Sequence, residues 1–370
     1  MYSESELAGA VEAGVLTPEA AAAFRNHVAT SRATPAVDEE HFKLLSGFND
    51  IFVAIAAALI LVAAARLGGF VGEWLIGIGN EPRQAGANMI GGGAAVAATS
   101  WMLAEYFTAK RRMALPSILL LLGFVAGAGA TIAGLFIANI PWLTETFHIT
   151  TDVQQQRLAG VIAAVAGALT ASAAWVHWRR FMVPITVAAG ALAVVGVGIA
   201  LILAFIPTAK DSINPILLVA GVLVFALAMR WDMSDLQRRT RRSDVAFWLH
   251  LAAAPLIAHP VFHMLGVFDG NISVPMAALV IALYVVFAAV ALAVDRRALL
   301  VSSLIYVLWA MYTLFNQSAT VELSAALTAL VIGSALLTLS AFWQPMRRMV
   351  VGLLGGIGDR LPPTQQIIPA

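Results

Sequence analysis

Three histidines in one apolar stretch are the residues of this sequence whose type and spacing best suit metal binding or proton transfer. His250, His259 and His263 fall within or beside residues 244–267, a tract long enough to cross a bilayer as a helix. His259 and His263 are four residues apart, so they share a helix face on which two imidazoles could bind a metal ion or relay protons. His250 is nine residues from His259 and faces about the opposite side. The sequence therefore predicts a metal site or a proton or solute path at His259 and His263.

Two prolines accompany these histidines. Pro255 and Pro260 have no backbone N–H to donate, and Pro260 also crowds the carbonyl of Leu256. We expect a kinked helix that turns its histidines toward the protein interior. Three interpretations stay open: hydrogen bonding that serves only structure, a proton or solute path, or a metal site with a third ligand from another segment.

Asn88 and Glu105 are the further candidates for a substrate or proton path. Asn88 lies near the outer end of the second apolar tract and has no assigned partner. Glu105 lies five residues before Lys110, where we expect a partnered or snorkelling carboxylate, or one coupled to the neighbouring basic cluster. Gly91–Gly93 lack the preceding strand and the lysine of a phosphate loop. Three glycines early in a membrane helix instead predict a local break or a very close helix contact.

The composition excludes several classes of chemistry. The 370 residues contain no cysteine, which excludes thiol catalysis, disulfides and iron–sulfur clusters. The 22 basic and 21 acidic residues leave no charge surplus for a nucleic acid. Hydrophobic residues make up 60% and charged residues 12%, against about 25% charged in a soluble domain. The sequence predicts an all-α, polytopic membrane helical bundle, without a cofactor and without an assigned catalytic residue.

Ten apolar tracts could cross the hydrocarbon core, which takes about 20 residues of helix. They are continuously apolar rather than alternating, which excludes membrane strands. The tracts are 50–68, 84–106, 113–138, 157–177, 181–206, 213–230, 244–267, 273–294, 297–316 and 322–344.

Basic residues alternate across these tracts and so predict an orientation. Fifteen lysines and arginines follow the even-numbered tracts, and four fall on the opposite side: Arg66, Arg83, Arg157 and Lys210. Positively charged connections stay in the cytoplasm, so we expect both termini there. The sequence predicts a multi-pass protein of a bacterial inner membrane whose first span serves as an uncleaved insertion signal.

The polar start of the chain predicts a small helical element. Ser3 with Glu6 forms a capping box, and Thr17-Pro18-Glu19 is a second helix start. We expect a cytoplasmic helical hairpin and linker over 1–37 and an interfacial helix over 38–49. The transmembrane domain would follow over 50–346, and a cytoplasmic tail over 347–370. The hairpin either packs on the inner loops or docks a cytoplasmic protein or a second copy of the chain.

Arginine pairs recur at the inner loops. Arg111-Arg112 and Arg179-Arg180 are each followed by apolar residues and a proline, which suggests a repeated helical hairpin. If so, 84–138 should superpose on 157–206. The alternative is that any such protein places arginine at its inner loops.

Three stretches resemble known sequences. Residues 6–21 and 106–112 are similar to a broad family of uncharacterised bacterial multi-pass membrane proteins with a short N-terminal helical hairpin. Residues 241–250 resemble a segment of hypothetical proteins from related bacteria. The resemblance implies this topology and brings no activity, cofactor or catalytic residue.

Three function classes remain. Ten spans, repeats, broken helices and small loops favour a transporter or permease for a small solute. His259 and His263 would support a membrane-embedded, histidine-dependent metal hydrolase instead. The N-terminal hairpin and inner loops would suit a membrane sensor or scaffold. We expect the lipid bilayer and a small solute as partners, and the transporter as the function.

Overall fold

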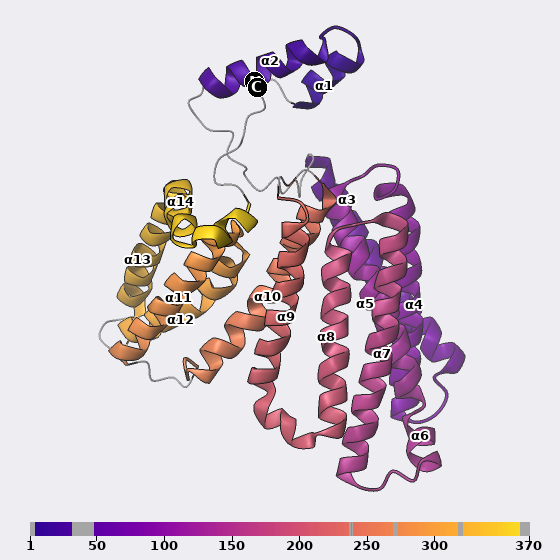
Figure 1. The fold of residues 1–370 in the computed structure, drawn as a ribbon. Coiled ribbons are helices and arrows are strands. Elements are labelled where there is room, and N and C mark those ends of the chain that lie inside the picture. The colour runs from indigo at the N-terminus through magenta and orange to yellow at the C-terminus, as the bar shows by residue number, and fades with distance from the viewer. Residues whose placement is uncertain are drawn as a thin grey trace. The chain divides into compact units, whose positions relative to one another are not determined.

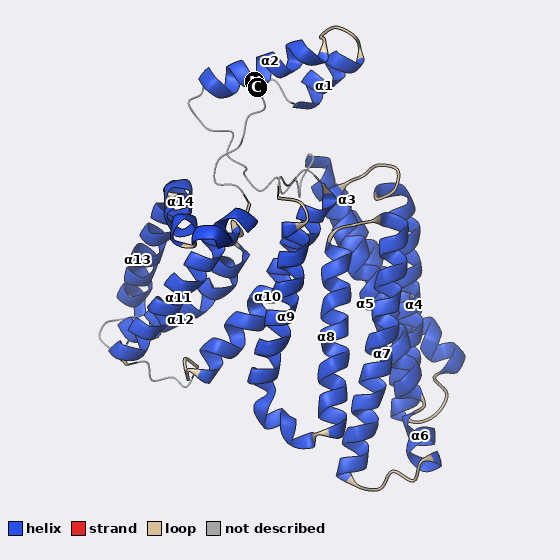
Figure 2. Ribbon diagram, viewed as in Figure 1, coloured by secondary structure: helices blue, strands red, loops and turns tan. Residues whose placement is uncertain are grey.

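The computed structural model describes residues 4–31, 48–236, 238, 240–268, 273–316 and 321–362. Within these ranges all regular structure is helical, as the sequence predicts (Figure 2). The chain divides into a small unit, residues 1–43 with 365–370, and a large helical domain, residues 44–364. Each unit is described by itself below.

Two helices make up the described part of the small unit. Helix α1 is Glu4–Glu12 and helix α2 is Pro18–Ser31. Thr17 caps α2, since its hydroxyl accepts a hydrogen bond from the backbone N–H of Ala20 at 3.1 Å. The cytoplasmic placement of this pair remains a prediction. Nearly all of the predicted interfacial helix, 38–49, lies outside the described residues.

Each of the ten apolar tracts coincides with a helix of the large domain (Figure 1). They are α3 (Phe48–Ile76), α4 (Glu81–Phe107), α5 (Ala114–Ala138), α7 (Asp152–Phe181), α8 (Ile185–Phe205), α9 (Ile213–Met233), α10 (Arg241–Met264), α11 (Val274–Val294), α12 (Ala298–Asn316) and α13 (Val321–Ala341). Shorter helices are α6 (Ile140–Thr146), the 3-10 helix η1 (Pro207–Ser212), α14 (Trp343–Leu353) and η2 (Gly355–Arg360).

Seven helices of the described chain are long and apolar enough to cross a membrane, which marks a multi-pass membrane protein: α3, α5, α7, α8, α9, α10 and α11. Helices α13 and α14 pass the same test of length and apolarity only as a pair, and their axes differ by 75°. Helix α4 carries glycines, Asn88 and Ser100 and is less apolar, but it packs between α3 and α5. The apolar stretch of α12, Leu300–Thr313, is short. The predicted count of ten therefore remains a prediction.

Close backbone contact explains the glycines of α4. A Cβ atom at Gly91 would lie 2.1 Å from the carbonyl oxygen of Gly68 on α3. A Cβ atom at Gly93 would lie 2.6 Å from the carbonyl oxygen of Gly127 on α5. Helix α4 runs uninterrupted through both positions, so the predicted local break is wrong and the predicted close contact is confirmed.

Helix α10 links the two halves of the large domain. In its first half, Val245, Leu249 and Ala253 pack in a cluster with residues of α8 and α9. In its second half, Ala258 and Phe262 pack with residues of α11 and α12. The ribbon bends between the two halves, where Pro255 and Pro260 lie (Figure 1).

Candidate functional site

Three ionisable side chains meet in the interior at one end of α9 and α10. Asp232 lies in the last turn of α9, His250 lies on α10, and Arg296 follows α11 in the turn before α12. Their exposed fractions are 1%, 0% and 3%. The turn reverses the chain because Asp295 adopts the left-handed conformation at φ 58° as the C-cap of α11. This reversal brings Arg296 back onto α9 and α10.

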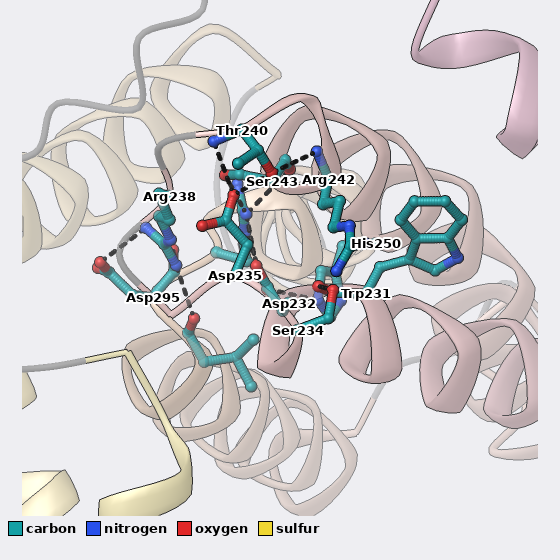
Figure 3. A network of polar contacts seen from close by, with 12 residues as sticks. Trp231, Asp232, Ser234, Asp235, Arg238, Thr240, Arg242, Ser243, His250 and Asp295 are labelled. Carbon is teal, nitrogen blue, oxygen red and sulfur yellow. Dashed lines mark hydrogen bonds and ion pairs between the residues drawn. The ribbon is translucent and has the colours of Figure 1, made fainter.

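The three groups form one hydrogen-bonded network, of which Figure 3 labels Asp232 and His250 together with Ser243. Arg296 donates from Nε to Asp232 Oδ2 at 3.1 Å and from Nη2 to Asp232 Oδ1 at 2.6 Å. This is the bidentate geometry of strong arginine–carboxylate pairs. The Nε2 atom of His250 lies 3.1 Å from Asp232 Oδ2. Arg296 Nη2 also donates to the backbone oxygen and the hydroxyl of Ser243, each at 3.1 Å.

The site is neutral when the imidazole is neutral. Asp232 contributes one negative charge and Arg296 one positive charge, while His250 donates its Nε2–H to the carboxylate. His250 Nδ1 is buried and has no hydrogen-bond partner among the described residues. The ring of Phe225 stands edge-on to the imidazole at 5.0 Å between centroids. The imidazole thus keeps one nitrogen available for a proton.

Asp295 anchors a second network directly beside the first. Its carboxylate accepts from Arg238 Nη1 at 3.0 Å and from Trp343 Nε1 at 2.8 Å, and it lies 3.5 Å from Arg347 Nε. Arg347 Nη2 also donates to the backbone oxygen of Pro362 at 2.5 Å. The adjacent residues 295 and 296 therefore tie the turn to α14 on one side and to α9 and α10 on the other.

Sequence reasoning missed these networks. The sequence pattern does not single out Asp232 or Asp295, and it marks the arginines only as charges and repeated pairs of the inner loops. His250 was correctly separated from His259 and His263, because nine residues turn it to the other side of the helix. One signal was present in the sequence: Asp295 and Arg296 are opposite charges at the end of a long apolar helix.

The predicted pair, His259 and His263, lies at the other end of α10. The rings share a face, with centroids 5.9 Å apart, but both side chains are exposed, so the expectation that they turn toward the protein interior is wrong. His259 Nδ1 lies 3.2 Å from the hydroxyl of Tyr306 on α12, and His263 Nδ1 lies 3.1 Å from the amide nitrogen of Asn214 on α9. Each imidazole therefore bridges α10 to a different neighbouring helix.

A metal at this pair would need further ligands. Among the described residues, no group of three histidine, cysteine, aspartate or glutamate side chains is placed to hold a metal ion. Instead, the imidazoles contact Tyr306 and Asn214. Such contacts are expected of a pair that serves structure or lines a path.

The remaining path candidates form separate contacts. Asn88 donates to Glu73 Oε1 at 2.7 Å, which joins α4 to α3. Glu105 accepts two hydrogen bonds from Arg180 on α7, at 2.9 and 2.5 Å. Pro255 and Pro260 lie inside α10, the first exposed and the second buried. The six predicted residues therefore fall at three places rather than along one path.

The Glu105–Arg180 pair is expected to contribute little to stability. Their side chains are 37% and 52% exposed, and an exposed ion pair is worth about 0.2–1 kcal/mol. Replacing Arg180 with alanine should therefore lower the melting temperature in detergent only slightly. Arg179→Ala is the matched control, since it removes a neighbouring arginine that stacks on Trp175. A loss of several kcal/mol in Arg180→Ala alone would contradict this assignment.

Comparison with models of protein families, with curated proteins and with solved structures finds no match to this chain. The residues themselves are therefore the basis for any functional proposal.

Proposed function

We propose that the protein is a proton-coupled membrane transporter of a small solute. The observation that carries this proposal is the burial of Asp232, His250 and Arg296 together at one end of the apolar helices α9, α10 and α11. Ionisable residues inside membrane helices are rare and mark ion pathways and proton relays. A buried ion pair is weak support for stability alone, because well-packed apolar side chains are often as stabilising.

Proton uptake by His250 can couple proton movement to solute movement. A proton can bind Nδ1 while Nε2 keeps its hydrogen bond to Asp232. The site would then carry a net positive charge, which is strongly disfavoured in a buried environment. Protonation therefore favours a state in which the network opens to water or takes up an anionic group of the solute.

Polar groups recur along α10 from this site to the other end of the helix. His259 lies nine residues, or about 14 Å, beyond His250 along the axis. Pro255, between them, and Pro260, directly after His259, each remove one backbone hydrogen bond and release a carbonyl group. Released carbonyls inside a membrane need a neighbouring donor or a water-lined cavity. These features support access of water to α10 near each histidine. Because His250 and His259 face opposite sides of the helix, they do not form one continuous route.

A proteoliposome assay tests the proposal. The vesicles hold the pH indicator pyranine and receive amino acids, sugars, organic acids or monovalent cations in turn. We expect one solute class to change the luminal pH with the wild-type protein. His250→Gln should abolish this change yet keep the protein folded, because glutamine can donate to Asp232 but cannot take up a proton. The exposed Lys210→Gln is the matched control.

The outcomes separate transport from coupling. If no class changes the luminal pH in vesicles that hold folded protein, the proposal is wrong. If a radiolabelled solute enters equally with wild type and His250→Gln, transport stands but the coupling role of His250 is wrong.

We propose further that ten helices span a bacterial inner membrane with both termini in the cytoplasm. The support is the asymmetry of fifteen against four basic residues. Because the chain has no cysteine, single cysteines at Lys210 and Ser234, which flank α9 and are exposed, can be labelled selectively. In intact cells opened only at the outer membrane, we expect an impermeant maleimide to label Lys210→Cys and spare Ser234→Cys. Labelling of both positions would contradict this topology.

A further inference from the structure

Helix α14 turns sharply away from the apolar helix before it. The axes of α13 and α14 differ by 75°, and Phe342 lies at the bend as the N-cap of α14. A helix that leaves a membrane-crossing helix at such an angle runs close to the plane of the membrane surface. Its side chains then divide between protein, lipid and headgroup according to their position around the helix.

One face of α14 packs on the protein. Trp343 and Arg347 are four residues apart on this face, and they are only 5% and 1% exposed. Both contact the carboxylate of Asp295. Met346 and Val350 extend the same face into a core cluster with residues of α11. This face of α14 is therefore covered by other residues of the chain.

A second face of α14 is apolar and exposed. Phe342, Met349 and Leu353 are separated by seven and four residues, so they lie within about 40° of one another around the helix. Their exposed fractions are 54%, 63% and 82%. On α13, Leu330 and Leu337 share one face and are 66% and 74% exposed. Exposed apolar side chains thus continue from the membrane-crossing helix onto α14.

Two arginines accompany this apolar stripe. Arg348 lies on α14, about 100–140° from the stripe, and its side chain is exposed. Arg297 is also exposed, and its guanidinium stacks on the Trp343 ring at 4.8 Å. A helix with an apolar stripe and flanking cations has the chemistry of a segment held at an anionic membrane surface.

We propose that α14 lies in the headgroup region, where Arg297 and Arg348, on the two sides of the stripe, bind phosphates of anionic phospholipids. Phe342, Met349 and Leu353 enter the acyl region below the headgroups. A lipid fits better than a protein partner because exposed apolar side chains lie on both α13 and α14 and the flanking groups are cations. The proposal requires that α13 crosses the membrane, and it does not depend on transport.

Labels at single positions test the depth of α14 in reconstituted full-length protein. Cysteines at Met349, Leu353 and Gln344 carry a fluorescent NBD group in vesicles that contain phosphatidylglycerol. We expect lipids brominated on their acyl chains to quench the labels at 349 and 353. Aqueous iodide should quench the label at Gln344, which lies about 140° from Met349. Quenching of the 349 and 353 labels by iodide, and not by brominated lipid, would overturn the proposal.

Lipid-dependent melting tests the arginines. Phosphatidylglycerol should raise the melting temperature of the protein in detergent, because a ligand of the native state stabilises it, whereas phosphatidylcholine and inorganic phosphate should not. We expect Arg297→Gln and Arg348→Gln each to weaken binding of phosphatidylglycerol about fivefold, and Lys110→Gln, an exposed cation elsewhere, to leave it unchanged. An equal shift with phosphatidylcholine, a shift with free phosphate, or equal shifts in all variants would overturn the arginine assignment.

Discussion

Replacing Arg296 with methionine is expected to lower the free energy of unfolding by about 3–5 kcal/mol. Methionine approximates the length of the arginine chain, but it leaves Asp232 buried without its cation. The hydroxyl and backbone oxygen of Ser243 lose a donor at the same time. The loss is measured as the shift in melting temperature in detergent and as the midpoint of unfolding in SDS.

Arg297→Met is the matched control for this prediction. Arg297 is the next residue, but it is exposed and makes a cation–π contact with Trp343 that is worth about 0.5–1 kcal/mol. Adding Asp232→Asn to Arg296→Met should recover most of the lost stability, since no buried charge then remains unpaired. Equal losses in Arg296→Met and Arg297→Met would show that the buried pair does not stabilise the fold.

Replacing Gly91 with alanine is expected to destabilise the protein by about 1–3 kcal/mol, the range for an overpacked interior. The new Cβ atom would lie 2.1 Å from the carbonyl oxygen of Gly68 and 2.8 Å from the Cα atom of Gly72. Both are backbone atoms of α3, so no side chain can rotate away and the two helices must separate. SDS unfolding of the purified protein measures the loss.

Gly196→Ala should have the opposite effect. Gly196 lies on α8, and a Cβ atom there would meet nothing within 4 Å. Alanine at an open helical position is more favourable than glycine by about 0.5–1 kcal/mol. If both substitutions stabilise the protein, the close α3–α4 contact does not exist as described.

The sequence by itself determined where the helices lie. Each apolar tract is a helix, because a continuous apolar run in a membrane must satisfy its own backbone hydrogen bonds. The tract boundaries were less well determined. The first tract was expected to end at residue 68, but α3 continues to Ile76. Gly68 and Gly72 lie inside α3, where their lack of side chains lets the backbone of α4 approach closely.

The tertiary structure alone decided which polar residues form a site. Asp232 and Arg296 are 64 positions apart, and no periodicity in the sequence relates them. Arg296 and Arg297 are identical neighbours, but the first is buried on a carboxylate and the second is exposed. The left-handed turn at Asp295 makes this distinction, since it fixes the direction in which each side chain leaves the backbone. Local sequence sets the helix, whereas the partner of a charge depends on which helices the packing brings together.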